Sequence, residues 1–207
     1  MSNDLLESLK NISKCFHPYF IEKVQDKKYW LSDSKSGQKL QLDFTNLLYE
    51  HTIVLSIDKD RDKKNDSSHY GGVAPDKLFP FLNPEVIHIT KKNDFILITY
   101  HKGYLYVFLL EMKNGEKDYY LKQMNGGRLF IDLVINLLSF HEQVVKSIRP
   151  HYFGVLCFSG KKSPDKGNTR HDNNISFKNR NGLLVSEWKN ASLNVEDLIS
   201  AANRAVP

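Results

Sequence analysis

The chain has 207 residues, of which 41% are hydrophobic and 26% charged, a composition that fits one globular domain and excludes a disordered protein. Its net charge of +5 favours a polyanionic partner, either nucleic acid or an anionic membrane. The two cysteines, Cys15 and Cys157, are too few for a disulfide framework, and a zinc site would need histidines as well. We expect both to be free thiols in a reducing cytoplasm.

A membrane partner is not expected. The N-terminal segment lacks the basic start and the apolar core of a signal peptide. The longest apolar run, residues 104–110, is too short to cross a bilayer. We therefore expect a cytoplasmic protein, and nucleic acid is the favoured polyanion.

The first elements follow from hydrophobic spacing. Apolar residues at helical spacing predict a helix over residues 4–16. A short strand is expected over 28–31. Residues 40–50 fit a helix slightly better than a strand, and both interpretations stay open. The β-branched run 51–57 predicts a strand.

The charged stretch 58–66 predicts a surface loop. Its alternating acids resemble a calcium-binding loop, but Lys63 and His69 occupy the positions that need glycine and a bidentate glutamate. Calcium is therefore not expected. A short helix over 74–82 and a short strand over 86–90 follow.

Residues 94–113 contain two β-rich runs around a short polar break, which predicts a hairpin. If residues 102–103 form a two-residue turn, Asp94 lies directly opposite Glu111, on the same face of the sheet. Lys113 is two residues further along and shares that face. Two acids and a lysine then meet at one end of an apolar hairpin. A longer loop or a bulge would shift this register.

Opposed like charges destabilise a strand pair, so a divalent cation is expected between the two acids. Oxygen ligands suit Mg²⁺, with Mn²⁺ as a substitute. Asp94 and Glu111 are the candidate ligands, and the carbonyl of Met112 could add a third. Lys113 could orient or deprotonate an attacking water, or it could stabilise charge in the transition state. The sequence does not choose between these two roles.

The longest helical pattern covers residues 119–148. The glycine pair 126–127 interrupts it, so either the helix breaks there or the small residues allow close packing, which we favour. The run 151–159 predicts a buried strand. A right-handed crossover through the helix would place this strand parallel to the one that carries Glu111.

The C-terminal part is basic. We expect a loop over residues 160–174 and short strands over 175–177 and 182–188. A helix is expected over 195–205, with Asn194 as its N-cap. The side chains expected to follow a phosphate backbone are Lys161, Lys162, Arg170, Lys178 and Arg180.

These elements predict an α/β fold, a mixed β-sheet flanked by helices, in a single domain over residues 1–207. Its core spans about 40–159, and a small basic appendage spans about 160–207.

An Asp that opens one strand, followed by Glu-x-Lys at the end of the next, resembles the PD-(D/E)xK nuclease superfamily. The resemblance covers roughly residues 50–159 and implies a restriction-endonuclease-like fold with an αβββαβ core. It implies that Asp94 and Glu111 ligate magnesium and that Lys113 assists the attacking water.

Two further residues enter through the resemblance. Gln123 matches a glutamine that many members carry near the active site, early in the helix after the Glu-x-Lys strand. Glu50 is the best-placed match for a glutamate that an earlier helix often supplies. Asn93 departs from the pattern, since many members have proline before the Asp.

The expected function is that of a metal-dependent DNA endonuclease that hydrolyses phosphodiester bonds with a metal-activated water. The alternative is a non-catalytic protein that binds nucleic acid or a partner on the same scaffold, and a nuclease directed at RNA is a third class. A subunit with one site that cuts both strands would act as a two-fold dimer, so a homodimer is possible, although the sequence shows no interface pattern.

Overall fold

The structure is a computed structural model, and it describes residues 2–16, 18–22, 26–33, 38–44, 49–57, 93–113, 119–144, 148–158 and 174–206. Among these residues, no helix combines the length and the apolar character needed to cross a membrane.

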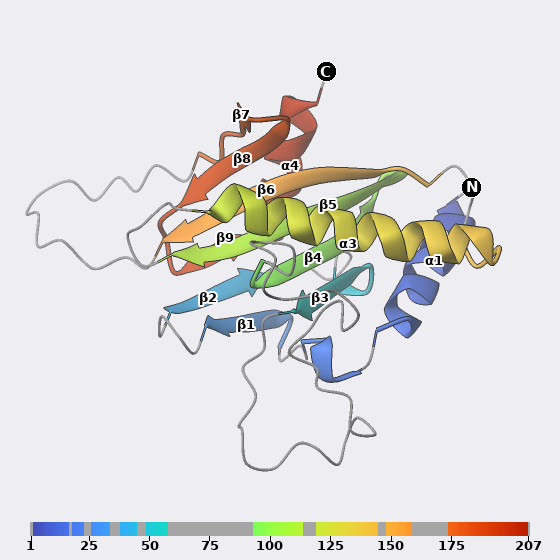
Figure 1. Cartoon of the computed structure of the whole chain (residues 1–207). Coiled ribbons are helices and arrows are strands. Elements are labelled where there is room, and N and C mark those ends of the chain that lie inside the picture. The colour runs from blue at the N-terminus through green and yellow to red at the C-terminus, as the bar shows by residue number, and fades with distance from the viewer. Residues whose placement is uncertain are drawn as a thin grey trace, which may run out of the picture.

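The described elements form a mixed α/β structure with two β-sheets (Figure 1). In chain order they are α1 (Ser2–Lys14), the 3₁₀ helix η1 (Pro18–Phe20), β1 (Lys28–Asp33), β2 (Gln38–Asp43), β3 (Thr52–Ser56), β4 (Phe95–His101), β5 (Tyr104–Lys113), α3 (Tyr120–Phe140), β6 (Pro150–Phe158), β7 (Lys178–Arg180), β8 (Leu183–Trp188), β9 (Ser192–Asn194) and α4 (Val195–Ala205). The α/β class predicted from the sequence is confirmed.

The larger sheet has six strands in the order β3-β4-β5-β6-β8-β7. Strands β3, β4 and β5 pair antiparallel, whereas β5, β6 and β8 run parallel. The connection from β5 through α3 to β6 produces the parallel pair that the sequence predicted. Because β8 pairs with β6 and β7 pairs with β8, the C-terminal strands extend this same sheet. The smaller sheet has three strands, in the order β1-β2-β9.

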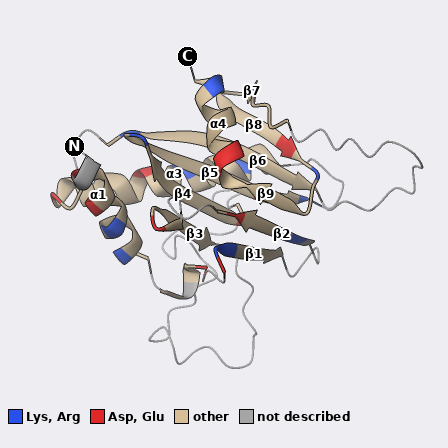
Figure 2. Ribbon diagram, turned by 180° about the vertical axis from the view of Figure 1, so that it is seen from behind, with Lys and Arg blue, Asp and Glu red and all other residues tan. Residues whose placement is uncertain are grey.

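The larger sheet is buried on both faces. Leu105, Val107 and Leu109 of β5 pack in one core with residues of α1 and α3. The alternate residues Phe108 and Leu110 pack in a second core, with residues of α4 and of the smaller sheet. Seen from behind, α4 lies in front of the sheet and α3 on its far side (Figure 2). Burial on both faces explains why β4 and β5 are continuously apolar instead of alternating.

Close packing is confirmed for Gly127, the second glycine of the pair in α3. The helix continues through both glycines, and Gly127 is buried against the hairpin. A Cβ atom at Gly127 would overlap the side-chain oxygen of Asn93 and lie 3.2 Å from Leu109. The absence of a side chain therefore lets α3 rest on β5 at this point.

Other predictions are also confirmed. The elements expected near 4–16, 28–31, 51–57, 151–159, 182–188 and 195–205 are present as α1, β1, β3, β6, β8 and α4. Asn194 caps α4, since its side-chain oxygen accepts from the backbone N–H groups of Glu196 and Asp197 at 2.8 and 3.2 Å.

Three local predictions are wrong. Over residues 40–43 the slightly favoured helix is contradicted and the strand alternative is confirmed, because Leu40 and Leu42 of β2 alternate into the core at a period of two. Helix α3 ends at Phe140 instead of continuing to 148, because Glu142 has a left-handed backbone with φ 56°. Strand pairing begins at Lys178 and not in 175–177. The elements expected over 58–66, 74–82, 86–90 and 160–173 lie outside the described residues.

We predict that Gly127→Ala destabilises the fold by about 1–3 kcal/mol, because the new methyl group overpacks the contact with Asn93. An exposed helical glycine would instead gain about 1 kcal/mol from the same change. Urea unfolding measures the difference. The cost should shrink in an Asn93→Ala background, in which the obstructing oxygen is absent. An equal cost in both backgrounds would show that this contact is not the cause.

Candidate functional site at the end of the β4–β5 hairpin

The hairpin register agrees with the sequence prediction. His101 pairs with Tyr104, and the ladder runs without a bulge to Phe95 opposite Leu110. Lys102 and Gly103 both have positive φ, 47° and 91°, as a tight two-residue turn with the correct twist requires. The next residues beyond the ladder are Asp94 and Glu111, so both acids lie at the end of the hairpin opposite to the turn.

Asp94 is held by backbone on both sides. Its carboxylate Oδ2 accepts a hydrogen bond from the backbone N–H of Met112 at 2.6 Å. Its carbonyl oxygen accepts from the N–H of Ile57, next to β3, at 3.1 Å. The half-buried Asp94 carboxylate is therefore fixed beside the C-terminal end of β5, next to the Glu111 side chain.

Glu111 is the most buried charged group of the site, with 1% of its side chain exposed. Its Oε1 lies 2.9 Å from Lys113 Nζ, whereas its Oε2 has no hydrogen-bond partner among the described residues. Burial, helped by the negative charge of Asp94, raises the pKa of Glu111 to about 8, and the contact with Lys113 only partly opposes this. The carboxyl is thus poised to take up a proton near neutral pH.

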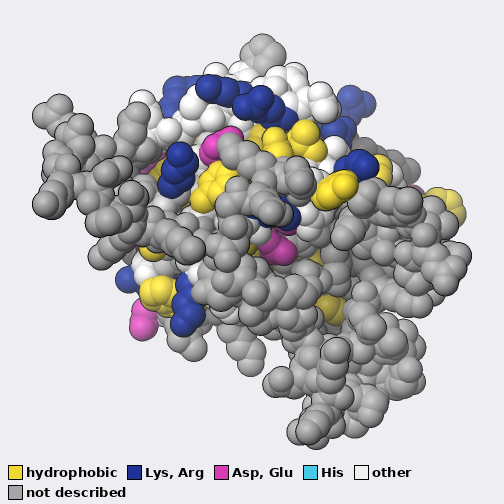
Figure 3. Space-filling view, turned by 60° about the vertical axis from the view of Figure 1, so that its left-hand side comes forward, with side chains coloured by type: hydrophobic (Ala, Val, Ile, Leu, Met, Phe, Trp, Pro, Cys, Tyr) yellow, Lys and Arg dark blue, Asp and Glu magenta, His cyan; other side chains and the backbone are white. Residues whose placement is uncertain are grey.

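Lys113 joins the strand to the helix. Its Nζ donates to Gln123 Oε1 at 2.9 Å while also lying 2.9 Å from Glu111 Oε1. Gln123 lies in the first turn of α3, and the crossover brings this turn to the carboxyl end of β5. The structure therefore brings together Asp94, Glu111, Lys113 and Gln123. Figure 3 views the molecule from the side at which β5 and β6 end, where acidic and basic side chains lie among hydrophobic ones.

Glu50, the candidate for the glutamate expected from an earlier helix, is not at the site. Glu50 is exposed in the turn before β3, and the pairing of Thr52 with Thr99 places it at the His101 end of β4, away from Asp94. The transfer of that family role to Glu50 is therefore wrong, because antiparallel pairing carries the start of β3 to the opposite end of the hairpin.

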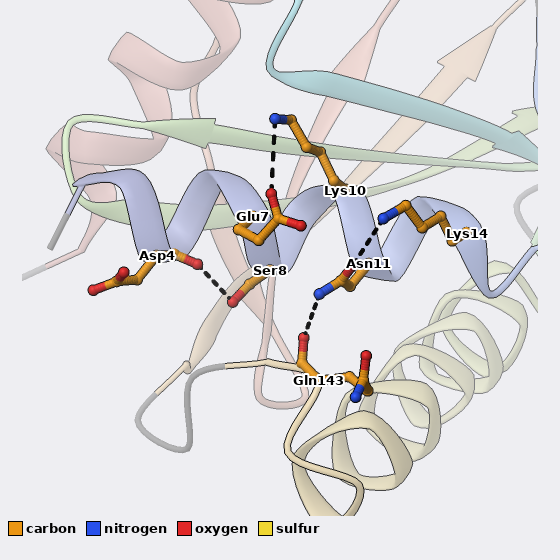
Figure 4. Close-up of polar contacts among 7 residues, drawn as sticks. All are labelled: Asp4, Glu7, Ser8, Lys10, Asn11, Lys14 and Gln143. Atoms are coloured by element: carbon orange, nitrogen blue, oxygen red, sulfur yellow. Dashed lines mark hydrogen bonds and ion pairs between the residues drawn. The ribbon is translucent and has the colours of Figure 1, made fainter.

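Helix α1 does not supply a glutamate to the site either. Glu7 lies on its surface and forms an ion pair with Lys10 at 3.7 Å (Figure 4). On another side of α1, Asn11 Nδ2 donates to the carbonyl of Gln143 at 2.8 Å. This contact ties α1 to the C-terminal end of α3, whereas Gln123 and the site lie at its N-terminal end.

Sequence reasoning missed the structural part played by Asn93. The side chain is fully buried, and its Nδ2 donates to the carbonyl of Phe95 and, at 3.4 Å, to that of Leu110. It thereby bridges β4 and β5 one step before the acid pair and lies under Gly127. The only signal in the sequence was a polar residue at the start of an apolar run.

The basic residues predicted to contact nucleic acid are described only in part. Lys178 and Arg180 are exposed on β7, the edge strand three positions from β5 in the sheet. At about 4.8 Å per strand, this edge lies roughly 14 Å from β5 across the sheet. Lys161, Lys162 and Arg170 lie outside the described residues.

The donor set is small. Within the described ranges, no three His, Cys, Asp or Glu residues gather closely enough to hold a metal ion. The two carboxylates nevertheless fit Mg²⁺ or Mn²⁺, which can bind through one or two carboxylates together with waters and substrate phosphate. The buried Glu111 Oε2 is an acceptor that a cation would satisfy. A contribution from the Met112 carbonyl stays a prediction.

No family model, no curated protein and no solved structure matches this chain. Membership of the PD-(D/E)xK superfamily therefore stays a prediction from the residues themselves.

We predict that Glu111→Gln stabilises the metal-free protein increasingly as pH rises. The folded-state pKa of Glu111 is about 8 against an ordinary value of 4.5, so the wild type loses stability as pH rises between these values. At about 1.4 kcal/mol per pKa unit, the total difference is several kcal/mol. Urea unfolding in a chelator at pH 5 to 9 measures it. Glu7→Gln, at an exposed site, is the matched control, and parallel pH profiles for wild type and Glu111→Gln would contradict the prediction.

Proposed function

We propose that the chain is a metal-dependent DNA endonuclease with a restriction-endonuclease-like fold. The observation that carries the proposal is the position of Lys113 Nζ, 2.9 Å from both Glu111 Oε1 and Gln123 Oε1 and beside the fixed Asp94. The consecutive order β3, β4, β5, α3, β6 supports it, since it matches the βββαβ part of the αβββαβ order expected of the PD-(D/E)xK superfamily, whereas β1 and β2 lie between α1 and β3.

Asp94 and Glu111 would hold the metal ion, with the Met112 carbonyl as a candidate third ligand. Magnesium bound there would lower the pKa of a bound water, polarise a phosphoryl oxygen and neutralise developing negative charge. Glu111 has to be ionised to bind the ion, and a nearby cation favours that form. The hydrogen bond from the Met112 N–H holds the Asp94 carboxylate in place, and this bond does not require Glu111 to be ionised.

Lys113 would act on the scissile phosphate or on the attacking water. Its amine lies 2.9 Å from Glu111 Oε1 and 2.9 Å from Gln123 Oε1, and these two acceptors fix its position. A positioned ammonium stabilises negative charge that develops on the phosphate oxygens. Deprotonation of the water is the other role open to it. Gln123 would be a positioning residue, since its Oε1 holds the lysine.

The charge balance supports DNA as the substrate. The net charge is +5, and Lys178 and Arg180 extend basic character to the β7 edge of the sheet. Contacts to phosphates make binding strongly dependent on salt concentration. Contacts of this kind hold the DNA backbone without reading the sequence of bases.

We predict that Mg²⁺-dependent cleavage of plasmid and oligonucleotide DNA falls at least about 100-fold in Glu111→Ala and in Lys113→Ala. Lys10→Ala removes a surface lysine of α1 and should cleave as the wild type does. Gel assays with Mg²⁺ or with a chelator measure the rates, and RNA substrates run in parallel test the other polymer. Wild-type rates in both site variants would refute the assignment.

One observation favours a second candidate, a non-catalytic protein that binds nucleic acid on the same scaffold. Burial raises the pKa of Glu111, and the described residues offer only two acids to a metal. A protonated Glu111 hydrogen-bonded to its neighbours would then be a structural group alone.

Titration with Mn²⁺ separates the two candidates. A nuclease site should bind Mn²⁺ in a calorimetric titration, and binding should be lost in Glu111→Gln but kept in Asp197→Asn, a change at an exposed carboxylate of α4. Salt-sensitive DNA binding without any Mn²⁺ binding would favour the non-catalytic protein.

A further inference from the structure

Helix α3 has an exposed hydrophobic face opposite the one that packs on the sheet. Leu129, Leu133, Leu137 and Phe140 are 66%, 41%, 53% and 81% exposed. Their spacing of four, four and three residues places them in one stripe along the helix. The buried residues of the same helix, among them Met124, Ile131 and Leu138, form the opposite face. A contiguous apolar stripe of this kind marks an interaction surface.

We propose that this stripe is a homodimer interface, in which α3 packs antiparallel against α3 of a second copy about a two-fold axis at Leu133. An isologous interface has to be complementary to itself. The stripe meets this condition, because Leu129 and Leu137 lie at equal distances on either side of Leu133. In the antiparallel pair, Leu133 meets its own copy and Leu129 meets Leu137 of the other chain.

The ends of the stripe are complementary in size. Phe140, which is 81% exposed, lies seven residues after Leu133, and Gly126 lies seven residues before it. The antiparallel arrangement therefore sets the phenyl ring of each chain over a glycine of the other. A glycine lets a large side chain approach the helix backbone closely. A parallel arrangement would place the two phenyl rings against each other and the two glycines against each other.

Charge favours the same direction. Lys122 is exposed at the N-terminal end of the stripe, and Glu142 is exposed just after its C-terminal end. In an antiparallel pair, Lys122 of each chain lies at the same end of the helix pair as Glu142 of the other chain, which follows the end of α3. A parallel pair would set lysine against lysine. Antiparallel packing also opposes the two helix dipoles favourably.

This proposal goes beyond the proposed nuclease activity and does not depend on it. The stripe lies on the outer face of α3, while Gln123 acts from the first turn. One helix pair is a small interface, so we expect a dimer that dissociates at about micromolar concentration.

The first experiment is sedimentation velocity of the full chain from about 1 to 100 µM, without DNA or metal. We expect a concentration-dependent dimer. Leu133→Glu should raise the dissociation constant of this dimer at least about tenfold, because two carboxylates would meet at the axis. Ser200→Glu on α4 adds the same charge at an exposed position and should dimerise as the wild type does. Circular dichroism shows whether each variant is folded.

Disulfide trapping fixes the geometry in a Cys15→Ser background, since Cys15 is exposed and Cys157 is buried. Leu133→Cys should form a covalent dimer with itself. Leu129→Cys should not, because its two copies are about 12 Å apart along the axis, but it should cross-link when mixed with Leu137→Cys.

Three results would overturn the proposal. The first is a monomer throughout the concentration range, including one whose stripe binds lipid vesicles or another protein instead. The second is a dimer that survives Leu133→Glu. The third is self-linking of Leu129→Cys at the rate of Leu133→Cys, which would indicate a parallel pair.

Discussion

The register of the β4–β5 hairpin is the constraint on which the site depends. Lys102 and Gly103 both take left-handed backbone conformations, so the turn uses only two residues and the ladder proceeds without a bulge. A slip of one residue would turn Glu111 and Lys113 to the opposite face of the sheet, into the core beside α4. The turn thus controls, from the far end of a long apolar hairpin, whether two carboxylates and an amine share one location. Asn93 reinforces this register by bonding to both strands beside the acids.

The burial of Glu111 makes the site electrostatically unusual. A carboxylate with 1% exposure and one oxygen without a partner in the described part of the chain destabilises the fold when ionised. Lys113 offsets part of that cost, but it also bonds to Gln123 and keeps a fifth of its side chain exposed. A buried carboxyl whose pKa is raised in this way is found often at functional sites, and a cation bound there would satisfy its second oxygen.

Local chemistry allowed much of this fold and site to be predicted from the sequence. The hairpin, its register, α3, the crossover and the Asn194 cap each depend on residues close in the chain or on a strong periodicity. The errors come from longer range. The sequence slightly favoured helix over strand at β2, because the pairing that decides it, with β1 and with the distant β9, is not visible in the local pattern. Glu50 was misplaced because the pairing of β3 with β4 determines at which end of the sheet it lies. Asn93 is covered by Gly127 of α3, a contact between residues distant in sequence that no local pattern encodes.

Helix α3 links these features because its different sides have different tasks. Its sheet-facing side needs Gly127 to approach β5 closely enough for Gln123 to reach Lys113. Its outer side carries leucines and a phenylalanine that the fold of one chain leaves in water. Leaving them exposed forgoes about 25 cal/mol for each Å² of apolar surface that burial would remove from water. Helix propensity does not require this choice, since alanine, lysine or glutamate would serve a solvent-facing helix as well or better. A second α3 resting on the stripe would remove that surface from water without disturbing the side that positions Gln123.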